Sequence, residues 1–322
     1  MNNYSYSQKF LHRIALSSSF LREIFFDLEK SFFLSKDFEV DNRYVFISGM
    51  ARSGTTVLLN AIYETKEFAS LTYQDMPFIL SPNIWSKLNK NSTLIDKQER
   101  AHDDGIKIDT NSPEAFEEIF WKTFDDVEPD TKNEFIDFIQ LLCRKHKKQR
   151  YLSKNNQNIK RIDYLIKNFS NSKIIIPFRE PLQHSFSLFN QHKKFSSLQK
   201  NDDFVRQYMS LIRHSEFGLD YMPYFESDLK YSYFDNINHW LEQWFLTYNM
   251  LGQFLNNPQV LFVCYEELCN NNSVFESILN FVEINLNHEY DFRLSLKSIN
   301  LNYDKELYNE CLRLYDNLKI QM

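Results

Sequence analysis

The sequence has 322 residues, of which 43% are hydrophobic and 25% are charged. This length suffices for a large α/β core, and the absence of repeats or Pro/Gly-rich linkers predicts one domain over residues 1–322. A formal net charge of −6 argues against general attraction to nucleic acid or an anionic membrane, so an anionic ligand needs a local basic site. The four cysteines lack CxxC spacing, and we expect a cytoplasmic, soluble protein without a metal site.

Residues 1–40 are the first predicted element, a helical N-terminal extension. Apolar residues recur at helical spacing from Phe10 to Leu28, which predicts an amphipathic helix docked on the domain. A helix on a membrane surface is the alternative, but Asp27 and Glu29 dilute its basic face. Charged residues interrupt every later apolar run, so we expect no integral membrane segment.

Four short apolar runs predict buried parallel strands, because both of their faces are apolar. They are Tyr44–Ser48, Phe68–Thr72, Lys173–Phe178 and Gln259–Cys264. Helical patterns lie between them, most clearly at Asn236–Leu255. Strands alternating with helices predict a three-layer α/β/α fold around a mostly parallel sheet, with ligands beyond the carboxyl ends of the strands. Residues 193–235 are aromatic and charged with weak periodicity, which predicts a helical lid or acceptor-binding insertion.

The first predicted strand runs directly into a glycine-containing loop, GMARSGTT at residues 49–56, after which a helical pattern begins. The glycine spacing is that of a P-loop, in which backbone N–H groups and a helix N-terminus surround a phosphate. A triphosphatase or kinase needs Lys after the second Gly, where this chain has Thr55. An ATP-dependent P-loop kinase therefore remains only as an alternative. The predicted anion site consists of Arg52, Ser53, Gly54, Thr55 and Thr56.

The third predicted strand ends in Arg179, and Pro181 suits the first turn of the helix that follows. Ser187 lies one to two turns into that helix, so the Arg179 and Ser187 side chains can converge on one anion. No Asp ends this strand to help hold Mg²⁺, which again disfavours a kinase.

In this order, the two motifs resemble those of sulfotransferases that use 3′-phosphoadenosine 5′-phosphosulfate (PAPS). GMARSGTT resembles the family's loop for the 5′-phosphosulfate, and REPLQHSFS resembles its 3′-phosphate site, with Arg179 and Ser187 at matching positions. The segment around Lys154 and the stretch VLFVCYEEL are similar to parts of bacterial members. The resemblance covers about residues 43–281. It implies a P-loop-like fold and metal-free, in-line transfer of a sulfuryl group from PAPS.

The resemblance leaves the acceptor open among small molecules, sugars and peptides. Family members that act on small molecules in the cytosol usually carry Lys where this chain has Arg52, so the chain resembles the carbohydrate, peptide and bacterial branches more closely. If the base were lost, the chain would instead be a non-catalytic nucleotide-binding module.

Sulfuryl transfer needs positive charge at the departing phosphate and a base for the acceptor proton. Arg52 is expected to supply the charge, and Lys154 adds to it unless it belongs to the solvated basic stretch around it. Family members often take the base from just after the second strand, which points to Asp75, with a turn role as the alternative. His102 is the second candidate, because the ordinary pKa of histidine is near neutral. Glutamates 114, 117 and 118 are interpreted as helix-capping residues.

Overall fold

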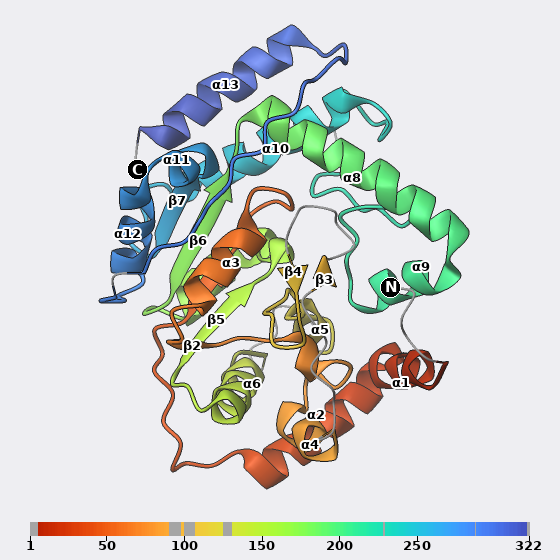
Figure 1. The fold of residues 1–322 in the computed structure, drawn as a ribbon, viewed down its shortest axis with the longest axis vertical. Helices are drawn as coiled ribbons and strands as arrows, with labels where there is room; N and C mark the ends of the chain where they lie inside the picture. Colours follow the sequence, from red (N-terminus) through yellow and green to blue (C-terminus); the bar gives the residue numbers. More distant parts are fainter. Residues whose placement is uncertain are drawn as a thin grey trace.

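The computed structural model describes residues 6–89, 98–99, 107–124, 131–227, 229–286 and 288–320. A five-stranded parallel sheet with the order β2-β5-β1-β6-β7 forms its centre (Figure 1). The strands are β1 Val45–Ile47, β2 Phe68–Ala69, β5 Arg150–Lys154, β6 Lys173–Phe178 and β7 Val260–Cys264. A two-stranded antiparallel ribbon joins β3 Gln98–Glu99 to β4 Lys107–Ile108. The four predicted strands are therefore confirmed, with β2 shorter than expected.

The sequence pattern does not predict β5, although this strand lies between β1 and β2. All five of its residues are buried, yet three of them are polar. Specific partners make this burial possible. The Arg150 guanidinium donates to the Val282 carbonyl at 2.7 Å and lies over the Phe68 ring, and the Tyr151 hydroxyl donates to Glu117 at 2.7 Å. A search for apolar runs misses a strand whose polar groups are satisfied by distant residues.

Side chains along the strands alternate between two hydrophobic cores, one on each face of the sheet. Val45 and Ile47 face the core that contains α3 Thr55–Tyr63, α11 Tyr265–Asn270 and α12 Asn272–Phe281. Phe46 faces the other core. The helices of that core include α6 Thr131–His146, α7 Ile162–Asn168, α8 Pro181–Asn201, α10 Ile237–Leu251 and α13 Lys305–Lys319. The predicted three-layer α/β/α fold is confirmed.

Helix α10 shows how a strongly periodic segment is positioned. The Asn236 side chain caps it by accepting a hydrogen bond from the Asn238 backbone at 3.0 Å, and a short 3₁₀ turn, Gly252–Phe254, follows its end. Its three- and four-residue steps bury Trp240, Trp244 and Tyr248. The predicted helix is therefore present, and its aromatic residues belong to the core.

The N-terminal extension contains two helices, α1 Tyr6–Ser17 and α2 Ser19–Phe33, instead of the one expected (Figure 1). The side chain of Ser18 caps α2 by accepting a hydrogen bond from the Leu21 backbone at 3.4 Å. Helix α1 packs against α9 Asp203–Leu211, while α2 packs against α4 Pro82–Leu88 and α6. Within the described ranges, no helix combines the length and apolar character needed to cross a lipid bilayer.

The predicted insertion at residues 193–235 begins inside α8, a continuous helix of 21 residues. Helix α9 and a largely irregular segment complete it. Phe217 in this segment stacks on Phe195 of α8, with ring centroids 6.2 Å apart. The segment after α9 therefore lies along the C-terminal half of α8.

Candidate active site

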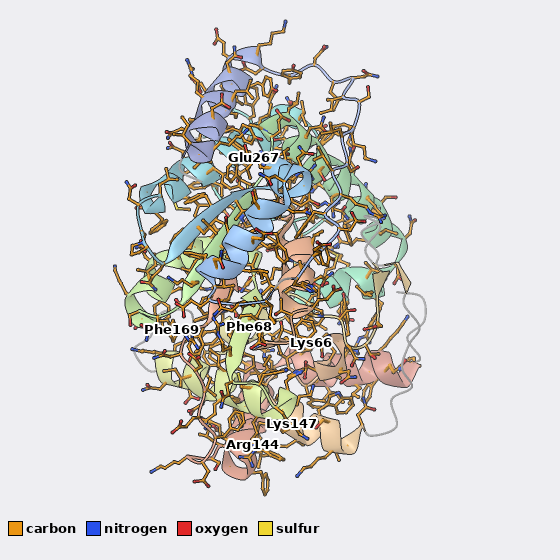
Figure 2. The ribbon with its side chains drawn as sticks, turned by 60° about the vertical axis from the view of Figure 1, so that its left-hand side comes forward. Lys66, Phe68, Arg144, Lys147, Phe169 and Glu267 are labelled. Atoms are coloured by element: carbon orange, nitrogen blue, oxygen red, sulfur yellow. The ribbon has the colours of Figure 1, made fainter. Side chains whose placement is uncertain are left out.

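A cavity of about 500 Å³ lies at the carboxyl edge of the parallel sheet. Residues at or just beyond the ends of four strands line it, namely Arg52, Lys154, Arg179 and Tyr265. In Figure 2, Glu267, which follows β7, lies in the upper half of the molecule, and Lys147, which precedes β5, lies in the lower half. Ligands of open α/β sheets bind at the carboxyl edge.

The loop from Gly49 to Gly54 is compact for steric reasons. A Cβ atom on Gly49 would lie 2.9 Å from the Pro177 carbonyl oxygen, and one on Gly54 would lie 2.4 Å from the Tyr265 ring. Gly54 also has a φ of 99° and precedes the first residue of α3. The Thr55 and Thr56 backbone N–H groups therefore stand in the first turn of a buried helix, where the amides have no intrahelical acceptors.

Two buried residues, His184 and Tyr248, make hydrogen bonds to the loop and to the strand beside it. His184 of α8 is fully buried, and burial lowers its pKa to about 3, so its ring is neutral. Its Nε2 lies 2.8 Å from the Ala51 carbonyl oxygen, to which the neutral ring donates. The Tyr248 hydroxyl donates to the Pro177 carbonyl at 2.9 Å. The first bond holds the loop against α8, and the second holds the end of β6 against α10.

The two sequence motifs meet in this cavity. Arg52 Nε donates to the Ser187 hydroxyl at 3.1 Å, and an Arg179 guanidinium nitrogen lies 3.3 Å from the Arg52 carbonyl oxygen. The Arg179 guanidinium lies over the Tyr265 ring, and its Nε is 3.8 Å from a Glu266 carboxylate oxygen without a hydrogen bond. Of the predicted residues of both motifs, all but Ser53 line this cavity, with donor capacity on Arg179 left for an anion. Ser53 is fully buried, and its hydroxyl donates to the Met50 carbonyl at 2.8 Å.

A segment that the sequence analysis did not single out closes one side of the cavity. Arg293, Ser295 and Lys297 line it. The Gln183 side chain exchanges two hydrogen bonds with the Lys297 backbone, both at 2.9 Å, and the Tyr265 hydroxyl donates to the Arg293 carbonyl at 3.1 Å. The spacing of these polar residues at every second position is the pattern of an extended segment, which was the available sequence signal.

Lys154 is buried at the end of β5 and lines the cavity, so it does not belong to a solvated stretch. Its Nζ lies 4.0 Å from Glu114 Oε1. Glu114 also accepts hydrogen bonds from the Tyr73 hydroxyl and the Ala115 backbone, both at 2.9 Å, and its side chain lines the same cavity. Sequence reasoning missed Glu114 as a candidate functional residue.

The helix-capping interpretation of the three glutamates holds only by position, since Glu117 is the N-cap residue of α5 and Glu118 lies in its first turn, and it fails for Glu114. The short helix α5 starts at Glu118, and neither Glu114 nor Glu117 caps it with its side chain. Glu117 is buried and accepts hydrogen bonds from Trp121, Tyr151 and Asn158, while both carboxylate oxygens of Glu118 accept from Arg161 at 2.8 Å. All three residues accept buried hydrogen bonds, and Glu114 alone among them borders the cavity.

Asp75 does not line the cavity. It is fully buried in the 3₁₀ turn Tyr73–Asp75, where its carboxylate accepts hydrogen bonds from the Thr72 backbone and hydroxyl and pairs with Lys145. Burial by itself would raise the pKa of Asp75, but Lys145, His146 and these hydrogen bonds lower it below its ordinary value. Its position fits the turn role that was the alternative. His102 lies outside the described residues.

The turn that Asp75 stabilises is attached to the segment carrying Glu114. Thr72 and Pro113 form an antiparallel bridge, and the Glu114 backbone donates to the Leu71 carbonyl at 2.9 Å. Tyr73 in the same turn donates to the Glu114 carboxylate. Asp75 therefore does not line the cavity, but it stabilises the turn whose Tyr73 holds the Glu114 carboxylate there.

The segment after α9 contributes His214, Glu216 and Phe217 to the cavity. Glu216 is buried, and one of its carboxylate oxygens accepts a 3.4 Å hydrogen bond from Asn156, which follows β5. The predicted insertion thus supplies side chains to the space beside Lys154 and Glu114.

Comparison with known proteins agrees with this architecture. The chain aligns with sulfotransferase STF9 from Mycobacterium avium at 14% identity and a TM-score of 0.50, covering 98% of this chain and 79% of that one. It aligns with sulfotransferase STF1 from Mycobacterium tuberculosis H37Rv at 11% identity and a TM-score of 0.50, covering 96% and 84%. These likenesses show a shared fold. Among curated proteins no match was found. The model of the sulfotransferase family matches residues 44–288, and the chain therefore belongs to the sulfotransferase family.

Proposed function

We propose that this protein transfers a sulfuryl group from PAPS to a hydroxyl or amine of an acceptor and releases adenosine 3′,5′-bisphosphate. One observation carries the proposal: Arg52 of the loop touches Ser187 of the second motif, and Arg179 reaches the Arg52 backbone. Two anion sites that share a contact fit a ligand with anionic groups at both ends of one ribose. PAPS is such a ligand.

In this proposal the loop and α3 hold the 5′-phosphosulfate. Gly54, Thr55 and Thr56, which line the cavity, surround it, and helix N-termini favour anions. Arg52 and Lys154 neutralise the charge that collects on the bridging oxygen as the sulfur–oxygen bond breaks. Arg179 and Ser187 bind the 3′-phosphate, for which the guanidinium offers charge-assisted hydrogen bonds.

Glu114 is the base that we propose in place of Asp75, because its carboxylate lines the cavity beside Lys154. The acceptor oxygen or nitrogen forms a bond to sulfur while the bond from sulfur to the bridging oxygen breaks, and that electron pair stays on the departing phosphate. The acceptor proton passes to Glu114. Tyr73 orients the carboxylate, and Asp75 positions Tyr73 through the turn.

An ATP-dependent kinase is the rival activity, and thermal shift separates the two cheaply. We expect adenosine 3′,5′-bisphosphate to raise the melting temperature in EDTA, and ATP with Mg²⁺ to have little effect, because Thr55 stands where a kinase carries Lys. Stabilisation by ATP with Mg²⁺ alone would overturn the proposal. Transfer of ³⁵S from labelled PAPS then separates an enzyme from a non-catalytic binding module.

A further inference from the structure

The N-terminal helices α1 and α2 carry a concentration of exposed apolar side chains. Of the 18 large hydrophobic side chains that are exposed in the described part of the chain, 8 lie between residues 6 and 34. On α1 they are Tyr6, Phe10 and Ile14, which follow one another at four-residue steps. Single exposed hydrophobic residues are common on protein surfaces, but a cluster of them marks an interaction site.

The exposed residues of α2 form one apolar ridge, which consists of Phe20, Ile24, Leu28 and Phe32. These side chains are 68%, 39%, 43% and 71% exposed, and residues at four-residue spacing lie in one row on a helix surface. Another face of α2 buries Phe26 and packs against α4 and α6. Helix α2 therefore uses one face to join the domain and leaves the apolar ridge exposed.

The kinds of side chain on the ridge follow the same order from either end. Phe20 and Phe32 stand at its two ends, and the branched aliphatic residues Ile24 and Leu28 stand between them. A twofold axis through the middle of the ridge exchanges the two aromatic residues and exchanges the two aliphatic residues. In an antiparallel pair of copies, aromatic side chains therefore meet aromatic ones and aliphatic side chains meet aliphatic ones. Two rows of four-residue spacing interdigitate in the commonest class of helix packing, at a crossing angle of about −50°.

The apolar area of the ridge matches what a dimer needs. The exposed fractions of its four side chains correspond to about 400 Å² per copy, since a whole aromatic side chain offers about 150–250 Å². About 57% of an ordinary protein–protein interface is apolar, so a contact centred on the ridge buries about 700 Å² per copy and about 1,400 Å² in all. Specific interfaces bury about 1,200–2,000 Å². The ridge by itself can therefore form the apolar part of an interface of ordinary size.

The row of residues beside the ridge disfavours a lipid surface as its partner. Ser19, Glu23, Asp27 and Ser31 each precede an apolar residue of the ridge, and this row carries two acidic groups and no basic one. Helices that lie on anionic membranes carry Lys and Arg on their polar face. The net charge of −6 acts in the same direction. At a contact between proteins, polar residues of this kind form the rim.

We propose that two copies of this chain form a symmetric dimer through the apolar ridge of α2, with α2 of one copy antiparallel to α2 of the other. The described residues that line the cavity lie outside α2, so each copy keeps its own site and the inference is independent of the proposed function. Helix α13 lies at the end of the molecule opposite α2 and stays outside the contact (Figure 1).

Light scattering during size-exclusion chromatography and sedimentation equilibrium test the proposal. Interfaces of this size have micromolar or tighter dissociation constants, so wild type at about 10 µM should have twice the mass of one chain. Ile24→Asp buries an unpaired charge near the middle of the ridge and should raise the dissociation constant at least about 100-fold. Ile320→Asp is the matched control, because Ile320 is 81% exposed at the C-cap of α13, and it should remain a dimer.

Phe32→Asp is a second variant that keeps the test independent of folding, since the Phe32 side chain is 71% exposed and adds little to the core. It should also be a monomer, and circular dichroism checks the fold of each variant. A monomeric wild type at about 100 µM overturns the proposal. A dimer that persists in both Ile24→Asp and Phe32→Asp overturns the placement on α2. A monomer that floats with vesicles of phosphatidylcholine and phosphatidylserine, and loses this binding in Ile24→Asp, overturns it in favour of a lipid surface.

Discussion

The cavity has a donor end, lined by the loop at residues 51–57 with Arg179 and Ser187, and an acceptor end, lined by Glu114, Lys154, Gln191 and Glu216. The two ends differ in how the chain builds them. At the donor end, a strand, a loop and a helix N-terminus follow one another within residues 45–63, and residues 51, 52 and 54–57 line the cavity. At the acceptor end, side chains come from segments around residues 114, 154, 191 and 216. Residues that lie close together in the sequence form a short motif, whereas a site made of side chains from distant segments depends on the whole fold.

The largest expected effect is the loss of turnover in Glu114→Gln, which should leave nucleotide binding at the donor end unchanged. Glu114→Gln keeps the shape of the side chain but cannot accept the acceptor proton, so kcat should fall by about 10²–10⁴-fold. The affinity for adenosine 3′,5′-bisphosphate should stay within about twofold, since the nucleotide is held by the loop and Arg179. Single-turnover transfer and calorimetry on the same preparation give both values. Turnover within threefold of wild type would remove Glu114 as the base.

Asp75→Asn provides the contrast, because Asp75 is buried and paired outside the cavity. Loss of its charge leaves Lys145 without its carboxylate partner and should cost on the order of 3 kcal/mol of unfolding free energy, while turnover per folded molecule falls far less than in Glu114→Gln. Urea denaturation and kcat corrected for folded fraction measure the two effects. A stable Asp75→Asn protein with kcat reduced 10²-fold or more would return the role of base to Asp75.

The pH dependence of stability tests the same residue independently. The pKa of Asp75 is lower in the folded protein than the ordinary value near 3.8, so the folded state favours the ionised carboxylate. Its contribution is complete above the ordinary pKa and is lost as pH falls through the lower, folded value. Between about pH 5 and pH 2, the melting temperature of wild type should therefore fall more steeply than that of Asp75→Asn. Parallel curves would contradict the pairing with Lys145.

Arg179→Ala tests the donor end. Loss of charge-assisted hydrogen bonds should cost about 1.5–3 kcal/mol, or roughly 10- to 150-fold in the affinity for adenosine 3′,5′-bisphosphate. Adenosine 5′-phosphosulfate lacks the 3′-phosphate, so its affinity should change much less. Ser187→Ala should follow the same pattern with a smaller loss. Equal weakening of both nucleotides would remove Arg179 and Ser187 from the 3′-phosphate.

A glycine pair tests the shape of the loop. Gly54→Ala places a Cβ 2.4 Å from the Tyr265 ring at a φ of 99°, and we expect a loss of about 1–3 kcal/mol in stability together with weaker nucleotide binding. Gly252→Ala is the control, since its Cβ would have no atom within 4 Å. Thermal unfolding and calorimetry compare the two. Equal behaviour of both variants would mean that the loop tolerates a side chain at Gly54.

The glycine spacing and the Arg-x₇-Ser spacing are local patterns, and the residues that they single out, apart from Ser53, line one cavity in the structure. The sequence predicted four of the five parallel strands but missed β5, whose polar residues are buried by partners such as Val282 and Glu117. Asp75 was proposed as the base because it follows a strand. Its place in the sequence does not show that its carboxylate forms an ion pair with Lys145, which lies 70 residues further along the chain. Glu114 lines the cavity because of the Thr72–Pro113 bridge and the hydrogen bond from Tyr73, and these contacts between distant segments have no local sequence pattern.

The central claim is that one cavity holds phosphate groups on both the 5′ and the 3′ side of a nucleotide. Titration calorimetry in EDTA with adenosine 3′,5′-bisphosphate and with adenosine 5′-monophosphate tests it most directly, because the two ligands differ by the 3′-phosphate alone. The account predicts that the bisphosphate binds at least tenfold more tightly in wild type and that Arg179→Ala removes most of this difference. Equal affinity of the two nucleotides for the wild-type protein would contradict it.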